Sequence, residues 1–138
     1  MQISVFTDGG ARGNPGPSGY GLVIFDNNKN LIFQDSKFTG VKTNNEAEYL
    51  ALIGALSWIK ANQAAFSIDK ISFFSDSQLL VRQVQGKYKV KAQNLKAYYQ
   101  TAISLLHEIS LPYLFQDIRR EFNTQADELA NQAMDRRC

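Results

Sequence analysis

Apolar and polar residues alternate along some short stretches of the chain and recur every three or four positions along others. The alternating stretches predict strands at residues 2–8, 20–26, 30–38, 70–76 and 113–120. The stretches with helical periodicity predict helices at residues 43–62, 77–86, 92–110 and 123–137. The predicted order of elements is therefore βββαβααβα.

This order predicts how the strands assemble. Short connections make the first three strands an antiparallel meander. Connections through helices make the first and fourth strands parallel neighbours, by right-handed crossover. We therefore expect an α/β fold with a five-stranded mixed sheet and helices on both faces. Asp8 and Asp76 then lie at the carboxyl edge of neighbouring strands, where ligands bind in open α/β sheets.

The ends of the predicted helices carry further signals. Thr43 and Glu46 have the spacing of a capping box at the start of the first helix. Apolar residues wrap most of the way round that helix, which predicts that it is largely buried. Two acids, Glu48 and Asp127, stand in the predicted first turns of the first and last helices. Gly86 is expected to end the second helix.

Length and composition restrict the class of protein. A chain of 138 residues predicts a single domain, residues 1–138. The one cysteine, Cys138, excludes an internal disulfide and a cysteine-based zinc site. The chain shows no signal peptide and no apolar run near the length of a membrane span. We therefore expect a cytoplasmic monomer without a membrane partner.

Charge is unevenly distributed although the net charge is only +2. Residues 77–107 contain no Asp or Glu, and tyrosines are interleaved with their basic residues. The basic residues of this segment are Arg82, Lys87, Lys89, Lys91 and Lys96. Such a segment is typical of a surface that contacts a polyanion. The alternative is an ordinary solvated face.

The stretch "FTDGGARGNPGPSGYG" (residues 6–21) holds six of the nine glycines. It is neither a dinucleotide fingerprint, since a strand rather than a helix follows it, nor a Walker loop, since the lysine of that motif is absent. It predicts a hairpin turn. Glycine also allows another backbone or a ligand to approach closely, and here it would do so beside Asp8.

Four acids share the expected edge of the sheet: Asp8, Glu48, Asp76 and Asp127. Singly, each has an ordinary role as a turn residue or at a helix N-terminus. Together they repel, because two carboxylates about 5 Å apart cost about 3 kcal/mol at an effective dielectric near 20. Protons or cations must neutralise such a cluster. An all-oxygen site suits Mg²⁺ or Mn²⁺, and two such ions can clamp a phosphodiester for attack by water.

Four segments resemble, in order and spacing, the motifs of type 1 ribonuclease H across essentially the whole chain. They are "FTDGGARGNPGPSGYG", "TNNEAEYLAL", "FSDSQLLV" and "NTQADELAN". The resemblance implies the ribonuclease H fold and hydrolysis of the RNA strand of RNA–DNA hybrids. Two Mg²⁺ ions, or Mn²⁺ in their place, would act in the reaction, which leaves 5′-phosphate and 3′-hydroxyl ends.

The resemblance also implies roles for individual residues. Asp8 and Asp76 would be the core metal ligands, Glu48 would bind metal and the ribose 2′-hydroxyl, and Asp127 would hold the ion that activates water. Thr43 would help to hold a DNA phosphate. The minor groove would be contacted by Asn14, Asn44, Asn45 and Gln78, with the bare backbone of Gly9 and Gly10 against the RNA strand.

Many bacterial members carry a long basic protrusion, called the handle, which this chain lacks. The chain resembles the bacterial and archaeal form without the handle. Only "GKYKVKAQN" joins the middle helices, and its Lys87, Lys89 and Lys91 would contact DNA phosphates instead.

The family's mobile histidine is also missing before the last acid. Arg120, seven residues before Asp127, has the spacing of an arginine in some relatives without the handle. Arg120 would steer the phosphate and Glu121 would assist a metal; the alternative for Arg120 is a surface residue that ends a strand. Arg12 is a further candidate for contact with the duplex.

Other functions stay open at this point. Some relatives without the handle also cut double-stranded RNA. A junction resolvase of the same fold is an alternative, although the glycine stretch and Thr43–Asn45 belong to hybrid recognition. A non-catalytic nucleic-acid-binding module would be marked by loss of one acid, and all four are present.

Overall fold

The computed structural model describes residues 1–137. Its strands are β1 (Gln2–Ala11), β2 (Gly16–Phe25), β3 (Leu31–Lys42), β4 (Lys70–Ser75) and β5 (Tyr113–Asp117). Its helices are α1 (Asn44–Asn62), α2 (Gln78–Val84), α3 (Gln93–Ile109) and α4 (Thr124–Arg136). A short 3-10 helix, η1 (Arg120–Phe122), precedes α4. The predicted order βββαβααβα is confirmed.

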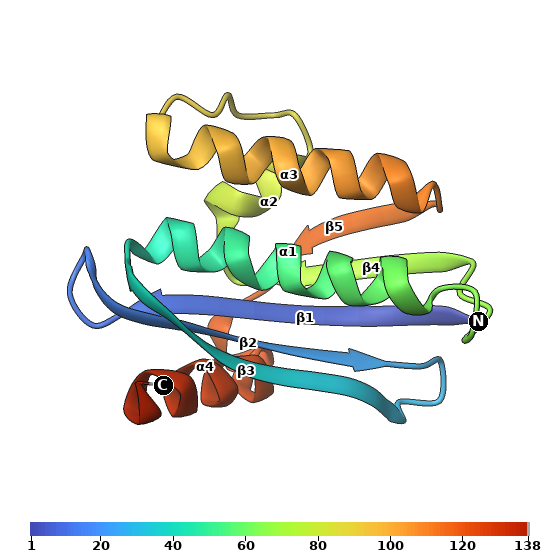
Figure 1. Ribbon diagram of the computed structural model, residues 1–138. Coiled ribbons are helices and arrows are strands. Elements are labelled where there is room, and N and C mark those ends of the chain that lie inside the picture. Colours follow the sequence, from blue (N-terminus) through green and yellow to red (C-terminus); the bar gives the residue numbers. More distant parts are fainter. Residues whose placement is uncertain (138) are drawn as a thin grey trace.

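The five strands form one mixed sheet in the order β3-β2-β1-β4-β5. The meander β1-β2-β3 is antiparallel, and β1, β4 and β5 are parallel. Figure 1 shows α1 lying along one face of the sheet with α3 beyond it, and α4 on the opposite face. The predicted sheet and its two helical layers are therefore confirmed.

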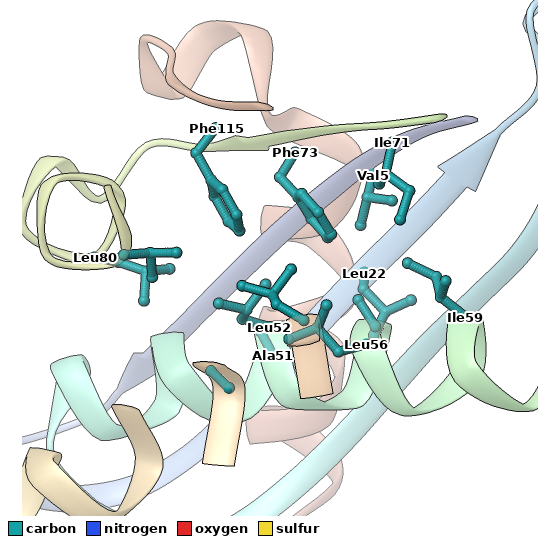
Figure 2. Packing of buried hydrophobic residues seen from close by; sticks show 14 of the residues in the cluster. Val5, Leu22, Ala51, Leu52, Leu56, Ile59, Ile71, Phe73, Leu80 and Phe115 are labelled. Carbon is teal, nitrogen blue, oxygen red and sulfur yellow. The ribbon is translucent and has the colours of Figure 1, made fainter. Parts of the chain in front are cut away.

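The main core lies between the sheet and α1. Val5 and Leu22 from the sheet face Leu52 and Leu56 from α1, and all four are at most 1% exposed (Figure 2). Burial of a side chain of this size contributes about 1.5–3 kcal/mol. Because α3 packs on the other side of α1, α1 is apolar around most of its circumference, as its sequence predicts. No helix within residues 1–137 is both long and apolar enough to cross a membrane.

The first three strands are longer than their sequence predicts. β1 continues past Asp8 to Ala11, and Gly9 and Gly10 pair with Tyr20 and Gly19 of β2. Glycine disfavours strands, but cross-strand pairing and packing decide the outcome. Asp8 therefore lies inside a strand, and the connection between β1 and β2 is residues 12–15, shorter than the residues 9–19 that the predicted strands leave between them.

Two glycines, Gly9 of β1 and Gly21 of β2, are required because helices pack closely against them. A Cβ on Gly9 would lie 2.3 Å from the backbone carbonyl of Ala47 in α1, and one on Gly21 would lie 2.2 Å from the Ala126 oxygen in α4. Any side chain would push the helix away from the sheet. The glycine density beside Asp8 thus brings both helices close to the end of β1.

The last strand is shorter than predicted. β5 ends at Asp117, which pairs with Ser75, the last residue of β4. Beyond that point β5 has no neighbouring strand to pair with, so the chain turns. Arg120 consequently lies in η1 rather than at the end of a strand.

The helix starts are held by side chains. In α1 the Glu46 amide donates to Thr43 Oγ1 (3.1 Å) and the Thr43 amide donates to Glu46 Oε1 (3.0 Å), which confirms the capping box. Asn123 occupies the N-cap position of α4, but its Nδ2 donates instead to the carbonyl of Thr7 (2.9 Å). This buried bond fixes the start of α4 to β1 one residue before Asp8.

Candidate active site

Three carboxylates converge where β1, β4 and α1 meet. Asp8, Glu48 and Asp76 each present an oxygen such that all three atoms lie within 4.8 Å of one another. Asp8 and Glu48 are buried, and Asp76 is half-buried. The structure thus brings together three of the four acids selected from the sequence in one tight cluster.

Strand register and helix packing position these side chains. Thr7 pairs with Ser75 in the parallel ladder, so the next residues, Asp8 and Asp76, leave the two strands side by side. Because α1 begins at Asn44, Glu48 is its fifth residue and lies just past the first turn, where the sequence predicted it. The Gly9 amide donates to Glu48 Oε1 (2.8 Å) and links the helix to β1.

Asp127 stands at the edge of this cluster. It lies in the first turn of α4, as predicted, and lines the same pocket as the other three acids. Asn131, four residues later on the same helix face, donates from Nδ2 to Asp127 Oδ2 (3.3 Å). The sequence analysis does not predict Asn131 as a site residue. Its spacing of four residues from Asp127 is the one sequence signal that points to this contact.

Burial and neighbouring charges raise the pKa values of three of these carboxylates. Burial, followed by the charge of Asp76 and the proximity of Asp127, raises the pKa of Asp8 to about 8. Burial and the charges of Asp8 and Asp76 raise the pKa of Glu48 well above its usual range. Burial also raises the pKa of Asp76, while the Arg120 guanidinium opposes this shift. Without a cation, the cluster therefore holds protons near neutral pH.

The donor set fits a hard divalent cation. Only carboxylate oxygens converge in the cluster of Asp8, Glu48 and Asp76, and oxygen is the donor that Mg²⁺ and Mn²⁺ prefer. A cation here would replace the protons that burial and repulsion now keep on the carboxylates. The pocket above the cluster has a volume of about 320 Å³ and is open to solvent.

Within residues 1–137, Arg120 is the one lysine or arginine that lines the pocket. Its Nε lies 3.7 Å from Asp76 Oδ2, although the side chain is 85% exposed. Glu121, selected as an assistant to a metal, instead accepts a bond from Arg119 Nη1 (3.0 Å). The structure therefore places Arg120 at the pocket and Glu121 against a neighbouring arginine.

The asparagines selected for minor-groove contact lie around the start of α1. The Ala11 amide donates to Asn44 Oδ1 (2.8 Å), and the Asn44 amide donates to Asn14 Oδ1 (3.0 Å). These bonds tie the hairpin to the helix, and both asparagines are exposed at the surface. Asn45 and Gln78 lie in the first turns of α1 and α2.

The remaining candidates lie at the pocket, in the hairpin and in the loop between α2 and α3. Gly9 and Gly10 line the pocket. Arg12 forms an ion pair with Asp135 of α4 (2.5 Å), which holds it across the hairpin. The exposed loop between α2 and α3 carries Lys87, Lys89 and Lys91, which do not line the pocket.

The chain is similar to known proteins over most of its length. The chain matches the family described as reverse transcriptase-like over residues 6–133. It is 37% identical over 136 residues to a bifunctional protein of Mycobacterium tuberculosis, covering 98% of this chain and 36% of that protein. The chain thus spans about a third of the length of these mycobacterial relatives.

Two further relatives match over most of their length. A protein of Halobacterium salinarum named ribonuclease HI is 34% identical over 134 residues, covering 97% of this chain and 65% of that protein. The crystal structure of the RNase H1 named LC11, isolated from compost, in complex with an RNA/DNA hybrid superposes with a TM-score of 0.92. It is 42% identical and the match covers 97% of both chains.

Proposed function

The chain belongs to the type 1 ribonuclease H family, and on that basis we propose that it is a metal-dependent endonuclease that hydrolyses the RNA strand of RNA–DNA hybrids. The observation that carries the proposal is the cluster of Asp8, Glu48 and Asp76 in an open pocket beside Asp127. The hybrid bound to the LC11 relative supports the substrate class. We further propose that residues 1–138 are one catalytic domain, acting as a cytoplasmic monomer.

The four acids would hold two Mg²⁺ ions, or Mn²⁺ in their place. Bound there, the metal would supply Lewis-acid stabilisation of the transferring phosphoryl group and a water of lowered pKa. Asp8 and Asp76 would be the central ligands because their strands fix them side by side. One Glu48 oxygen accepts the Gly9 amide, which leaves the other for metal and the ribose 2′-hydroxyl. Asp127 would complete the ligand set from α4.

The reaction products follow from attack by water. Its oxygen bonds to phosphorus while the bond from phosphorus to the 3′-oxygen breaks, leaving a 5′-phosphate on one fragment and a 3′-hydroxyl on the other. Burial of Asp8 and Glu48 would strengthen their interaction with a cation, because the local dielectric around buried groups is low.

The start of α1 supplies the contacts to the duplex. The Asn44 and Glu46 amides are occupied by Asn14 and Thr43. Among the hydrogen bonds of residues 1–137, the Asn45 amide has no acceptor. A free amide at a helix N-terminus binds anions, so it would meet a DNA phosphate beside Thr43. Asn14, Asn44, Asn45 and Gln78 would contact the minor groove, where hydroxyls and base edges are exposed.

Arg120 provides a first test of the pocket's charge. Replacing Arg120 with Ala removes the guanidinium 3.7 Å from Asp76 and the positive charge available to the scissile phosphate. We expect kcat for hybrid cleavage to fall roughly fivefold to tenfold, as for removal of a partly solvated charge. Arg119→Ala, an exposed neighbour paired with Glu121, is the matched control and should keep the wild-type rate. Equal rates for both variants would remove Arg120 from the mechanism.

The basic loop provides a second test. We expect Ala at Lys87, Lys89 and Lys91 to weaken hybrid binding and to lower the slope of log Kd against log salt by about one for each phosphate that the loop no longer neutralises. The cleavage rate at saturating hybrid should stay unchanged, because these lysines lie outside the pocket. Lys70→Ala, an exposed lysine at the start of β4, is the control. An unaltered salt slope would show that the loop does not contact the duplex.

The proposed substrate is tested by comparing labelled duplexes. We expect wild-type protein with Mg²⁺ to cut the RNA strand of an RNA–DNA hybrid, to leave a DNA duplex intact, and to lose all activity in EDTA. An RNA duplex belongs in the same assay, because it also presents 2′-hydroxyls in a wide minor groove. Cutting of the DNA duplex, or cleavage that persists in EDTA, would contradict the proposal.

A further inference from the structure

A second hollow lies on the α1 side of the sheet, away from the carboxylates. It is a groove of about 470 Å³ between β3, α1 and the start of α3. It shares no lining residue with the carboxylate pocket. Lys37, Lys42, Tyr20 and Tyr98 are among its polar lining residues, and no acid lines it within residues 1–137. The groove therefore combines positive charge with hydroxyl groups and an apolar floor.

Its two lysines are available to a ligand. Lys37 is exposed and Lys42 is half-buried. No ion pair in the described part of the chain uses either of them. Asp35 lies two residues before Lys37 on the same face of β3, but it does not line the groove. The charge at the groove itself is therefore positive and suits a polyanion.

Tyr20 adds a hydroxyl built into the groove. The residue is only 6% exposed, and it pairs with Lys37 across β2 and β3. Its hydroxyl lies against Gly54, where a Cβ would come within 2.6 Å of it. No hydrogen bond within residues 1–137 uses this hydroxyl. Burial and the nearby Asp35 raise the pKa of Tyr20 to about 12, so it remains a neutral donor suited to a phosphate oxygen.

The groove continues from the start of α1. Lys42 immediately precedes Thr43, the N-cap that the proposed function places on a DNA phosphate. On α1 the groove is lined from Leu50 to Ser57, which lies roughly 9–20 Å along the helix from its start at 1.5 Å per residue. At 3.4 Å per nucleotide this corresponds to roughly three to six nucleotides.

The lining also includes aromatic rings. Tyr98 and Phe38 are half-buried at the groove. A positively charged groove with aromatic side chains is the usual design for binding a single nucleic-acid strand, because bases stack on the rings while cations meet the phosphates.

We propose that this groove binds a single-stranded extension of the DNA strand where that strand runs past the hybrid at Thr43. Lys37, Lys42 and the Tyr20 hydroxyl contact its phosphates, and Tyr98 stacks on a base. The inference rests on the proposed function, because Thr43 sets the point at which the DNA enters. It makes the junction between a hybrid and unpaired DNA a preferred binding site.

The test compares three kinds of hybrid with Asp76→Asn protein in Mg²⁺, so that the RNA stays intact. The first hybrid is blunt. The second carries a single-stranded DNA extension of about eight nucleotides, which is enough to span the groove at roughly 3.4 Å per nucleotide. In the third, the same extension is paired with complementary DNA. The extension is placed at the 5′ end and at the 3′ end of the DNA strand in separate hybrids. At one of these two ends we expect the single strand to tighten binding roughly tenfold, as stacking of one or two bases would. The salt slope should steepen by about 0.7 for each phosphate contacted.

Substitutions distinguish binding in the groove from non-specific attraction of the DNA by surface charge. Lys37→Ala and Tyr20→Phe should each reduce the gain from the extension, and Asp35→Asn should increase it. Lys70→Ala should leave it unchanged. Equal Kd values for blunt and extended hybrids, a gain that survives Lys37→Ala, or an equal gain from the duplex extension would overturn the inference. Failure of the proposed function would appear separately, as lack of cleavage of the blunt hybrid by wild-type protein.

Discussion

The Asp76→Asn variant is expected to lose hydrolysis of the hybrid by at least about 1000-fold, or about 4 kcal/mol in activation free energy. Asparagine keeps the size of the side chain but removes a negative charge that lies within 4.8 Å of the oxygens of Asp8 and Glu48. The cluster then offers one charge fewer to a divalent cation. Single-turnover cleavage of labelled hybrid in Mg²⁺ measures the loss.

Folding should not account for that loss. Burial and the charge of Asp127 raise the pKa of Asp76, so a neutral side chain of the same size should not lower the melting temperature. Glu128→Gln changes an exposed acid next to Asp127 in the sequence and is the matched control, with wild-type activity expected. A folded Asp76→Asn protein that cleaves within tenfold of wild type would contradict the assignment of Asp76 as a central ligand.

The Asp8→Asn variant is expected to be more stable than wild type in EDTA at pH 8. The folded-state pKa of Asp8 is about 8, whereas an unfolded Asp titrates near 3.9. Between these values the folded protein binds the extra proton, so the free energy of unfolding falls as pH rises, by up to about 1.4 kcal/mol per pH unit. Stability from this group is complete below about pH 3.9 and lost as pH rises through about 8.

Asparagine at position 8 carries no charge and removes this decline. We expect a gain of about 2 kcal/mol at pH 8, or roughly 6 °C in Tm, because asparagine avoids both the burial of a charged carboxylate and its repulsion by Asp76. The gain should shrink toward pH 5, where Asp8 in wild type holds its proton. Added Mg²⁺ should stabilise wild type more than the variant, since only wild type keeps the full ligand set. A lower Tm for the variant in EDTA at pH 8 would contradict the repulsion at this site.

Local pattern was sufficient to predict most of the fold. Periodicity separates strands from helices, and the crossover rule makes β1 and β4 parallel neighbours, as observed. The ends of elements were less predictable, because they depend on partners distant in sequence. Gly9 and Gly10 belong to β1 since β2 pairs with them and α1 packs against Gly9. β5 ends early because β4 has ended beside it.

The candidate site also combines residues that local motifs predict with residues whose roles depend on distant partners. Asp8, Glu48 and Asp76 were selected from motifs and elements, and the structure brings them together. Asn123 and Asn131 were not selected as site residues, because their roles depend on tertiary contacts. Asn123 bonds to Thr7 across the sheet. The groove at Tyr20 and Lys37 arises from pairing of β2 with β3 and from the space over Gly54, which no local pattern reveals.

We propose that the carboxylate pocket directs water to a phosphodiester of the RNA strand. Cleavage of a labelled hybrid in heavy-oxygen water, followed by mass analysis of both fragments, tests this step. We predict that the heavy oxygen enters the 5′-phosphate of one fragment and that the other ends in an unmodified 3′-hydroxyl. A 2′,3′-cyclic phosphate without incorporated label would show that the ribose hydroxyl, rather than water, attacks phosphorus, and would exclude the proposed hydrolysis.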